Sequence, residues 1–577
     1  MTAPSSSTRS ELAQAISGLK RFFFTAGVFS FFINLLMLVP AIYMLQVYDR
    51  VLASRSETTL TMLTIIMLGL FALMAVLEWL RSQLLVQAGL RMDADLNQRV
   101  LSASFQQNLR HSGSNAGQAM ADLVSVRQFL TGNGLFAFFD APWTPIFIFV
   151  IFMLHPLLGA VSVVAGLMLV ALTFLTERMT QRPLAEANSA NVAANLYITN
   201  SLRNAEVIEA MGMFPALRAR WYAMHRRMLG LQTLASDRAG GISALTRFVR
   251  ISFQSLILGA GALLVIEDKS TPGTMIAASI LMGRALAPVE LLIGNWKNFV
   301  GARASYRRLE KMLKAFPAAP ERMSLPAPKG HYALENVVAG APGSTTPILR
   351  GINITIPAGS VVGVIGPSGS GKSTLARLLV GVWAAGAGVV RLDGADIFAW
   401  DKTELGPHMG YLPQDVELFD GTVAENISRF GEVDAQAVVR AAQRAGVHEM
   451  ILRLPQGYDT PIGAGGSVLS GGQRQRIGLA RAIYGDPSVV VLDEPNSNLD
   501  DVGEAALVNA ITQLKREGKT VIVITHRTSV LSAVDLLLVM REGMVQLFGP
   551  RNEVLAALAS ANQQGAGQQP ARQATPA

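Results

Sequence analysis

The stretch Gly366-Pro-Ser-Gly-Ser-Gly-Lys372-Ser373-Thr374 decides how the second half of this chain folds. It has the G-x-x-x-x-G-K-[ST] spacing of a phosphate-binding loop. The apolar run Val361–Ile365 precedes it, and Leu375–Leu379 opens a helix after it. In this strand–loop–helix context, glycines let backbone N–H groups surround phosphate oxygens at a helix N-terminus, where the dipole favours negative charge. The alternative is a glycine-rich turn before an ordinary helix.

Two side chains of the loop have separate expected roles. Lys372 supplies a positive charge for the β- and γ-phosphates of a nucleotide, and the Ser373 hydroxyl is placed to bind Mg²⁺. The candidate nucleotide-binding residues of the loop are Gly366, Pro367, Ser368, Gly369, Ser370, Gly371, Lys372, Ser373 and Thr374.

A second candidate site follows the apolar run Val489–Leu492, which predicts a buried parallel strand. The strand ends in two carboxylates, Asp493 and Glu494. Because Asp493 ends the strand nearest the loop, we expect it to hold Mg²⁺. We expect Glu494 to polarise the water that attacks the γ-phosphate, as general base or water-positioning group. Without the phosphate loop, two such acids would more often cap a helix.

Further strings complete a recognisable set. They are Leu469, Ser470, Gly471, Gly472 and Gln473 (LSGGQ), Gln414 in Tyr411-Leu-Pro-Gln, Asp500 in Asn496-Ser-Asn-Leu-Asp, and His526 in Ile524-Thr-His. In this order, residues 330–550 resemble the ABC transporter ATPase family. The resemblance implies ATP and Mg²⁺ as cofactors, with Gln414 sensing the γ-phosphate and the metal, His526 contacting the γ-phosphate, and Lys372 and Glu494 completing the catalytic set.

The resemblance also implies an assembly of two copies. ABC ATPases dimerise head to tail, with each ATP between the phosphate loop of one copy and the LSGGQ of the other, and Asp500 would link the two sites. This chain contains one of each motif. A homodimer, or a heterodimer with a close relative, is therefore expected.

Two positions depart from the family pattern. Ala341 stands where an aromatic residue usually stacks on adenine, an interaction worth about 1–3 kcal/mol per base. Tyr332 or His331 is a nearby candidate to replace it. Before LSGGQ, many exporters have a Glu-Arg pair that contacts the partner's coupling helix, whereas this chain has Gly463-Ala-Gly-Gly466. Neither departure involves the catalytic residues, so hydrolysis is still expected.

The first half of the chain is apolar enough to span a membrane. Of the 577 residues 50% are hydrophobic and 16% are charged, and runs of bilayer-spanning length lie before about residue 300. We predict six spans, at about Phe22–Val47, Leu60–Leu85, Leu135–Leu154, Leu157–Thr176, Ile242–Ile266 and Met275–Ile293. The fold class is therefore a six-helix membrane domain of the ABC exporter type fused to an α/β P-loop ATPase domain.

Basic residues predict the orientation of these spans. Lys20 and Arg21 precede the first span, whereas the third–fourth turn at His155-Pro156 has no lysine or arginine. The segment between the fourth and fifth spans contains Arg178, Arg182, Arg203, Arg218, Arg220, Arg226, Arg227 and Arg238. Both termini and the ATPase are thus expected in the cytoplasm. The net charge of +8 reflects this topology, and no basic face with base-stacking groups indicates nucleic-acid binding.

The expected organisation has five parts. They are an N-terminal tail (1–20), the membrane domain with cytoplasmic helix extensions (21–310), a linker (311–329), the nucleotide-binding domain (330–560) and a disordered tail (561–577). Two proline- or glycine-containing turns, at Asn108–Gly117 and Met211–Pro215, are candidate coupling turns; a solvated helix–loop is the alternative. The chain has no cysteine, which excludes disulfides and thiolate chemistry.

The membrane half carries strings of its own. Tyr48–Arg55 (YDRVLASR), Asp140-Ala-Pro-Trp143, Asn204–Met213 and Gly283–Pro288 resemble type I secretion permease/ATPases, above all the protease- and lipase-exporting (PrtD-like) group. The resemblance implies a Gram-negative inner-membrane exporter of an unfolded polypeptide with an uncleaved C-terminal signal. It also implies a periplasmic adaptor and an outer-membrane channel as partners. Only about 20 residues precede the first span, so an N-terminal peptidase domain is not expected.

Polar residues inside the spans are candidate functional groups. Arg284 and Glu290 in the sixth span, and Asp140 and Trp143 in the third, either line a polypeptide path or pair structurally. Two alternative functions exist for such an ATPase. A lipid or glycan exporter uses the same fold, and a non-transporting ABC ATPase would lack the spans. Export of a secreted protein such as a protease or lipase is the predicted function.

Overall fold

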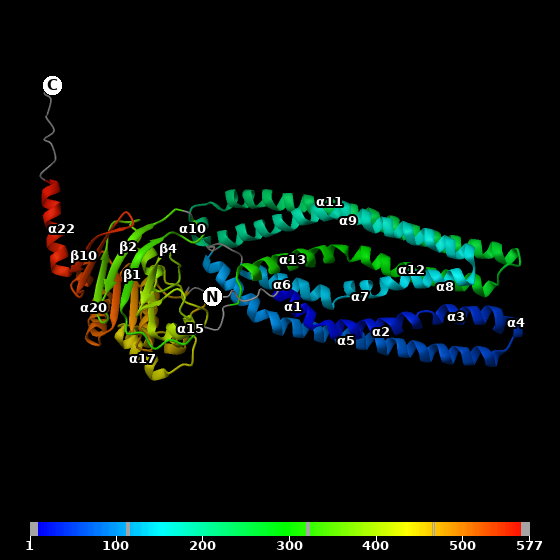
Figure 1. Cartoon of the computed structure of the whole chain (residues 1–577), viewed down its shortest axis with the longest axis horizontal. Coiled ribbons are helices and arrows are strands. Elements are labelled where there is room, and N and C mark those ends of the chain that lie inside the picture. The colour runs from blue at the N-terminus through cyan, green and yellow to red at the C-terminus, as the bar shows by residue number, and fades with distance from the viewer. Residues whose placement is uncertain are drawn as a thin grey trace, which may run out of the picture. The chain divides into compact units, whose positions relative to one another are not determined.

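The computed structural model describes residues 10–110, 116–202, 204–318, 323–344, 346–463, 466 and 468–566. The chain divides into two compact units, the first comprising residues 1–108 and 113–318 and the second residues 109–112 and 319–577. The first is helical, and the second contains the strands (Figure 1).

The helices of the first unit follow one another with short connections. They are α1 (Glu11–Gly18), α2 (Lys20–Leu36), α3 (Val39–Gln46), α4 (Leu52–Ser54), α5 (Glu57–Arg110), α6 (Ala116–Thr131), α7 (Asn133–Asp140), α8 (Thr144–Leu154), α9 (Pro156–Leu202), α10 (Ala205–Ala210), α11 (Phe214–Ile266), α12 (Pro272–Gly294) and α13 (Trp296–Ala315). A π-helical turn (Val47–Val51) joins α3 to α4, and a 3₁₀ turn (Ala141–Trp143) joins α7 to α8.

Six helical stretches of the described residues are long and apolar enough to cross a membrane. They are Lys20–Ser54, Glu57–Arg110, Gly117–Leu154, Pro156–Leu202, Phe214–Ile266 and Pro272–Gly294. Each contains one predicted span, so the six-span prediction is confirmed. The 54 residues of α5 would reach about 80 Å at 1.5 Å per residue, far more than the roughly 30 Å of a bilayer core. This helix is therefore longer than a bilayer core requires, and the cytoplasmic location of its extension stays a prediction.

Proline and extended backbone explain the breaks between helices. His155 has an extended conformation between α8 and α9, as expected for a residue before proline. Gly212, with φ of 61°, lies in the turn between α10 and α11, inside the predicted break at Met211–Pro215. Residues 111–115 of the other candidate coupling turn lie outside the described residues. The coupling role of both turns stays a prediction.

A clasp of three residues joins the first span to the last. We use turn end for the end of the first unit where α4 meets α5, α8 meets α9, and α11 meets α12 (Figure 1). There, Asp49 accepts hydrogen bonds from the Thr271 hydroxyl at 2.6 Å and from the Gly273 N–H at 2.9 Å. A Cβ at Gly273 would lie 2.6 Å from the Asp49 carboxylate, so only glycine fits. The clasp therefore caps α12 from the other end of the sequence.

A buried polar network fixes the first, second and third spans. Asp140 accepts a hydrogen bond from Asn34 at 2.7 Å and pairs with Arg81 at 3.4 Å. Arg81 also donates to Ser30 and lies over the ring of Phe136. Since all the charges are paired inside the protein, the structural alternative holds for Asp140. Trp143 is buried as well, against Phe31 and Phe147.

The second unit contains two sheets. A four-stranded antiparallel sheet has the order β2-β1-β4-β5, and a six-stranded sheet has the order β10-β9-β3-β8-β7-β6, parallel except for β10. The strands are β1 (Tyr332–Ala339), β2 (Leu349–Ile356), β3 (Val361–Ile365), β4 (Ala387–Leu392), β5 (Ala395–Asp396), β6 (Met409–Leu412), β7 (Val489–Asp493), β8 (Thr520–Ile524), β9 (Leu536–Arg541) and β10 (Met544–Pro550).

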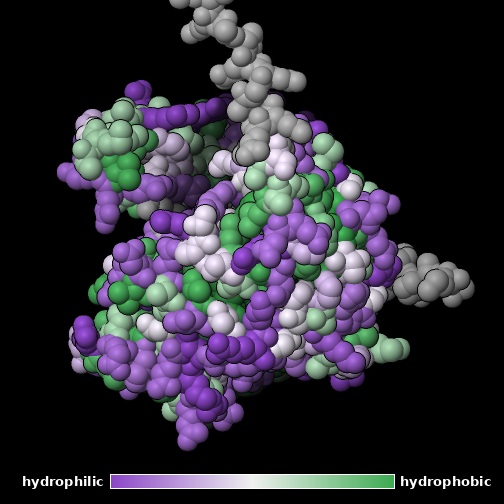
Figure 2. Space-filling model, turned by 90° about the vertical axis from the view of Figure 1, so that its left-hand side faces the viewer, coloured by the Kyte–Doolittle hydropathy of each residue, from purple (hydrophilic) through white to green (hydrophobic). Residues whose placement is uncertain are grey.

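Helices cover this parallel sheet. The α-helices of the second unit are α14 (Lys372–Leu379), α15 (Lys402–Leu405), α16 (Val423–Ile427), α17 (Ala435–Arg444), α18 (His448–Leu452), α19 (Gly471–Ile483), α20 (Asp501–Arg516), α21 (Thr528–Leu531) and α22 (Arg551–Ala566). Every residue of β7 and β8 is buried, as in a parallel strand covered on both faces. The visible face of this unit is mostly hydrophilic, with hydrophobic residues in small areas (Figure 2). The α/β prediction is thus confirmed.

Two predicted boundaries were wrong. Residues 311–315 of the predicted linker continue α13, because its apolar positions Leu309, Met312 and Leu313 remain buried. Residues 561–566 of the predicted tail belong to α22. The N-terminal residues 1–9 and the tail residues 567–577 lie outside the described residues.

Candidate functional site

The phosphate loop lies between β3 and α14, as predicted. Gly369 and Gly371 have φ values of 79° and 95°, which favour glycine, and a Cβ on Gly371 would lie 2.6 Å from Leu349. Because α14 begins at Lys372, the first N–H groups of this helix have no partner within it. The loop therefore has the free donors that bind an anion.

Sheet register brings the other predicted residues to the same edge. Val364 of β3 pairs with Ile524 of β8, which pairs with Asp493 of β7. All three strands are parallel, so the phosphate loop, the Asp493–Glu494 pair and His526 follow the carboxyl ends of neighbouring strands. This is the edge where open α/β sheets bind ligands.

Lys372 is buried and bonded to its own loop. Its ammonium group donates to the carbonyl oxygens of Gly366 and Pro367, both at 2.9 Å. These neutral acceptors leave the positive charge without a carboxylate partner among the described residues. A triphosphate can therefore replace them with stronger, charge-assisted hydrogen bonds.

Asp493 and Ser373 fit a magnesium ion. Asp493 is 1% exposed, and its Oδ1 has no hydrogen-bond partner in the described part of the chain. Burial raises the pKa of Asp493, while a hydrogen bond from the Ser373 side chain opposes this rise. A buried carboxylate oxygen without a partner is an open ligand position. No cluster of three or more His, Asp or Glu occurs among the described residues, but a magnesium ion that is shared with phosphates needs only one or two carboxylates.

Glu494 is held between two residues of the predicted set. Gln414 donates to its Oε2 at 3.1 Å, and His526 Nε2 lies 3.6 Å from its Oε1. Its backbone has φ of 50°, and its N–H donates to the carbonyl of Ile524. Such a conformation is uncommon outside glycine and occurs at functional sites. The structure thus brings these three predicted residues together.

The LSGGQ residues begin α19. Ser470 is the N-cap, and its side chain and that of Gln473 form a reciprocal capping box. Gly472 passes close to the next loop, because a Cβ there would lie 2.7 Å from the carbonyl of Asn498. Leu469 is buried, and Gly471 opens the helix. The motif therefore presents a helix N-terminus, a second anion-binding end.

Asp500 has partners within its own chain. It caps α20 by accepting from the Gly503 N–H at 2.9 Å, and it pairs with Arg476 of α19 at 2.7 Å. The Gly503 hydrogen bond, together with the Arg476 charge, lowers the pKa of Asp500. Its predicted link between two sites stays a prediction.

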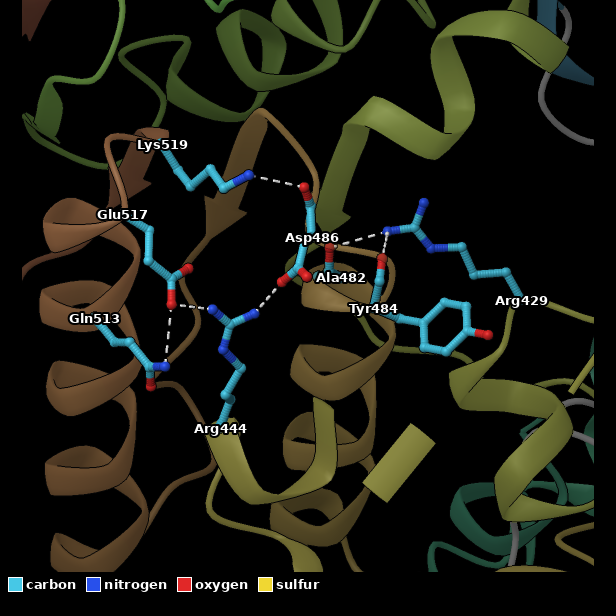
Figure 3. Close-up of polar contacts among 8 residues, drawn as sticks. All are labelled: Arg429, Arg444, Ala482, Tyr484, Asp486, Gln513, Glu517 and Lys519. Carbon is cyan, nitrogen blue, oxygen red and sulfur yellow. Dashed lines mark hydrogen bonds and ion pairs between the residues drawn. The ribbon is translucent and has the colours of Figure 1, made fainter. Parts of the chain in front are cut away.

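Two arginines fix the end of α19 and the loop to β7 (Figure 3). Arg429 is largely buried and donates to carbonyl oxygens of Arg481, Ala482 and Tyr484 at the end of α19, and to those of Gly406 and Met409 at the start of β6. Burial, followed by the neighbouring Arg481 charge, lowers the pKa of Arg429.

Arg444 holds the following loop. It lies between Asp486 and Glu517 and pairs with both (Figure 3). Lys519 donates to the Asp486 carbonyl at 2.9 Å. Because this loop connects the LSGGQ helix with the strand of Asp493, both arginines support the site.

Sequence reasoning missed Gln475 and Arg429. Gln475 is buried, donates to the Glu494 carbonyl and accepts from Asn498. The available signal was a glutamine among the buried residues Ile477, Gly478 and Leu479 of one helix. Arg429 gave no signal, because its partners are backbone atoms distant in sequence.

The proposed replacements for the missing aromatic residue were wrong. Tyr332 is fully buried and donates to the Leu379 carbonyl. His331 and Tyr332 lie at the start of β1, whereas Ala341 follows its end. At about 3.3 Å per residue the eight residues of β1 separate them by more than 20 Å. Leu349 and Ile348 are large apolar side chains that lie beside Gly371 of the phosphate loop.

Comparisons with known proteins agree with this fold. Residues 349–497 match the ABC transporter family, and residues 23–288 match the ABC transporter transmembrane region. A bacterial Atm1-family ABC exporter with ATP bound has the same fold, with a TM-score of 0.81, 22% identity, and coverage of 96% of this chain and 99% of that one.

Two relatives indicate a narrower class within this family. The type I secretion system ATP-binding protein PrsD of Rhizobium meliloti (strain 1021) is 46% identical over 555 residues, 96% of this chain and 95% of that protein. The cyclolysin secretion/processing ATP-binding protein CyaB of Bordetella pertussis (strain Tohama I) is 30% identical over 92% of this chain and 75% of that protein. The chain belongs to the ABC transporter family, among the ATP-binding proteins of type I secretion systems. It is a multi-span ATPase that couples ATP hydrolysis to transport.

Proposed function

We propose that this protein exports an unfolded polypeptide with a C-terminal secretion signal across the inner membrane of a Gram-negative bacterium. It acts as a homodimer in the lipid bilayer, with both termini in the cytoplasm. A periplasmic adaptor and an outer-membrane channel continue the path, and the cargo is a secreted protease, lipase or similar protein. The observation that carries this proposal is the similarity to PrsD along nearly the full length of both chains.

The geometry supports a division of labour at the nucleotide. The α14 N-terminus and Lys372 bind the phosphates, and Lys372 leaves its two loop carbonyls to do so. Ser373, Asp493 and Gln414 would hold Mg²⁺, which neutralises phosphate charge during transfer. Glu494 orients and deprotonates the attacking water. Gln414 and His526 lie beside the Glu494 carboxylate and position it.

The second copy completes each site. The N-terminus of α19, with Ser470 to Gln473, covers the triphosphate bound to the phosphate loop of the other copy, and Asp500 links the two sites. ATP binding then closes the two ATPase units, and hydrolysis and phosphate release open them again. This cycle remodels the path between the membrane units.

The ATPase response of the full chain in lipid nanodiscs tests the cargo. We expect saturable stimulation by a C-terminal fragment of a candidate substrate and none by the matching N-terminal fragment. A response to lipid alone, without any polypeptide effect, would instead support the lipid or glycan exporter.

A further inference from the structure

Two neighbouring spans carry an ion pair inside the predicted membrane region. Arg250 of α11 pairs with Glu290 of α12 at 2.9 Å, and both side chains are about 30% exposed. Glu290 is thus partly neutralised within the chain. The same two helices also bring Gln254 to the backbone of Gly283, where a Cβ would lie 3.5 Å from the amide nitrogen.

Arg284 lies at the middle of the sixth span. It follows the start of α12 at Pro272 by twelve residues and precedes its end at Gly294 by ten, which places it about 18 Å from the turn end. Gln254 precedes the end of α11 at Ile266 by twelve residues and lies at the same depth. Arg247 is one helical turn beyond Arg250 on α11.

Arg284 and Arg247 are exposed, and neither has an ion-pair partner among the described residues. We call Arg247, Arg250, Gln254 and Arg284 the cationic stripe. The stripe has three arginines, and the neighbouring Glu290 neutralises one of them, so two net positive charges are left. A charged side chain at the bilayer centre normally faces a water-filled cavity or a partner rather than lipid.

The acids of the other spans lie farther from the turn end than Arg284, near the depth of Arg247, which precedes the end of α11 by 19 residues, or about 28 Å. Glu78 of α5 and Glu177 of α9 each follow the start of their helix by 21 residues, about 31 Å from the turn end. Asp140 is buried and paired with Arg81. A second copy with this fold would therefore bring these carboxylates to the far boundary of the bilayer and leave Arg284 without one.

We propose that the cationic stripe forms part of the wall of the polypeptide path and binds acidic segments of the cargo. This inference rests on the proposed polypeptide export and adds a preference for negatively charged cargo segments. Asp and Glu side chains of an unfolded segment reach Arg284 and Arg247 as it passes, while Gln254 donates to its backbone or side chains. The Arg250–Glu290 pair limits the local charge, so that binding stays reversible.

Two unfolded polypeptides test the stripe. They have the same length and sequence, except that Asn and Gln replace every Asp and Glu in one of them. Their binding to the full chain in zwitterionic nanodiscs is measured by fluorescence anisotropy. We expect the acidic polypeptide to bind the wild-type protein about two- to fivefold more tightly, as expected for one partly exposed ion pair. Arg284→Gln should remove most of this difference, and Arg284→Lys should retain it.

Arg226→Gln is the matched control, because it removes the same charge from an exposed position outside the stripe, where no ion pair is present among the described residues. Basal ATPase activity and thermal midpoint confirm that the variants are folded. Equal binding of the two polypeptides by the wild-type protein would overturn the charge preference and leave polypeptide export standing. If neither polypeptide binds or stimulates the ATPase, both proposals fail. A lower thermal midpoint in Arg284→Gln with an unchanged preference would assign Arg284 to a contact between copies and also overturn the inference.

Discussion

One oxygen of the Glu494 carboxylate accepts a hydrogen bond from Gln414, and the other lies 3.6 Å from His526 Nε2. The side chain lies at the edge where β7 and β8 end, and the backbone of Glu494 has a left-handed conformation. A general base that is already oriented loses less entropy when the water arrives. The side chain can therefore be changed with little effect on binding but a large effect on chemistry.

Glu494→Gln should abolish hydrolysis and retain ATP. The amide fills the same space but cannot accept a proton, and the loss of a general base typically costs about 10²–10⁴-fold in rate. Phosphate release and retained radiolabelled ATP measure the two effects separately. Lys372→Ala is the contrast, because it should lose both hydrolysis and export. Export at the wild-type rate in either variant would contradict the assigned roles.

Ala341→Tyr should increase ATP affinity. A ring at this position could stack on adenine, which is worth about 1–3 kcal/mol, or about 5- to 150-fold in Kd. Equilibrium binding of ATP to the full chain measures the change. Ala341→Leu adds apolar volume without an aromatic face and should give a smaller gain. An unchanged Kd in Ala341→Tyr would mean that adenine does not lie beside Ala341.

At the scale of elements, α19 depends on contacts at both ends. The capping box of Ser470 starts the helix, and Arg429 satisfies the carbonyl oxygens at its end. Arg429 and Phe430 both have φ near 60°, an uncommon pair of conformations that the surrounding contacts must maintain. At the same place a Cβ on Gly410 would lie 2.2 Å from the Ala482 carbonyl. The end of α19 and the start of β6, which leads to Gln414, are therefore fixed together.

Arg429→Met should destabilise the ATP-binding unit and lower its activity. It leaves buried carbonyl oxygens without a donor, at about 1–3 kcal/mol for each group that water cannot reach. The thermal midpoint of the purified chain should fall by several degrees, and kcat for ATP should fall with it. Arg429→Lys keeps the charge but has fewer donors, so its thermal midpoint and kcat should lie between those of the wild-type protein and of Arg429→Met. Arg444→Gln removes a more exposed arginine and should lower the thermal midpoint by less. An equal decrease in the two variants would contradict the special role of Arg429.

The sequence allowed most of the elements to be predicted, because local patterns determine them. Apolar runs located the six spans, and glycine spacing located the phosphate loop. The carboxyl ends of parallel strands then brought Asp493, Glu494 and His526 together. The contacts of Arg429 and the Asp49–Gly273 clasp were missed, because they join backbone atoms to residues far away in the sequence. Tyr332 was assigned wrongly for a related reason: burial depends on tertiary packing, which a single strand pattern does not show.

At the scale of the whole molecule, the proposed sites need residues from two copies. Mixed dimers can test this directly. One chain carries Lys372→Ala, and the other carries Ser470→Arg. If each site combines the loop of one copy with the LSGGQ of the other, then one site has both changes and the other has none. Hydrolysis should return to about half of the wild-type level in this two-fold assembly, whereas each variant alone should be inactive.

The reciprocal mixture is the control for that experiment. A chain with both changes, paired with a wild-type chain, places one damaged element in each composite site and should be inactive. If one chain formed a complete site by itself, the two mixtures would give the opposite results. Separate affinity tags on the two chains allow the mixed dimers to be isolated before phosphate release is measured.

The Asp49 clasp has a mechanical consequence. Its hydrogen bonds to Thr271 and Gly273 fasten the first span to the last at the turn end, where α3 also packs against α12. With that end fixed, the two spans can separate only by rotating about it. A rotation of about 10° would then move the opposite ends apart by about 5 Å over the roughly 30 Å of a bilayer. The clasp thus makes this pair of spans a lever that turns about the turn end.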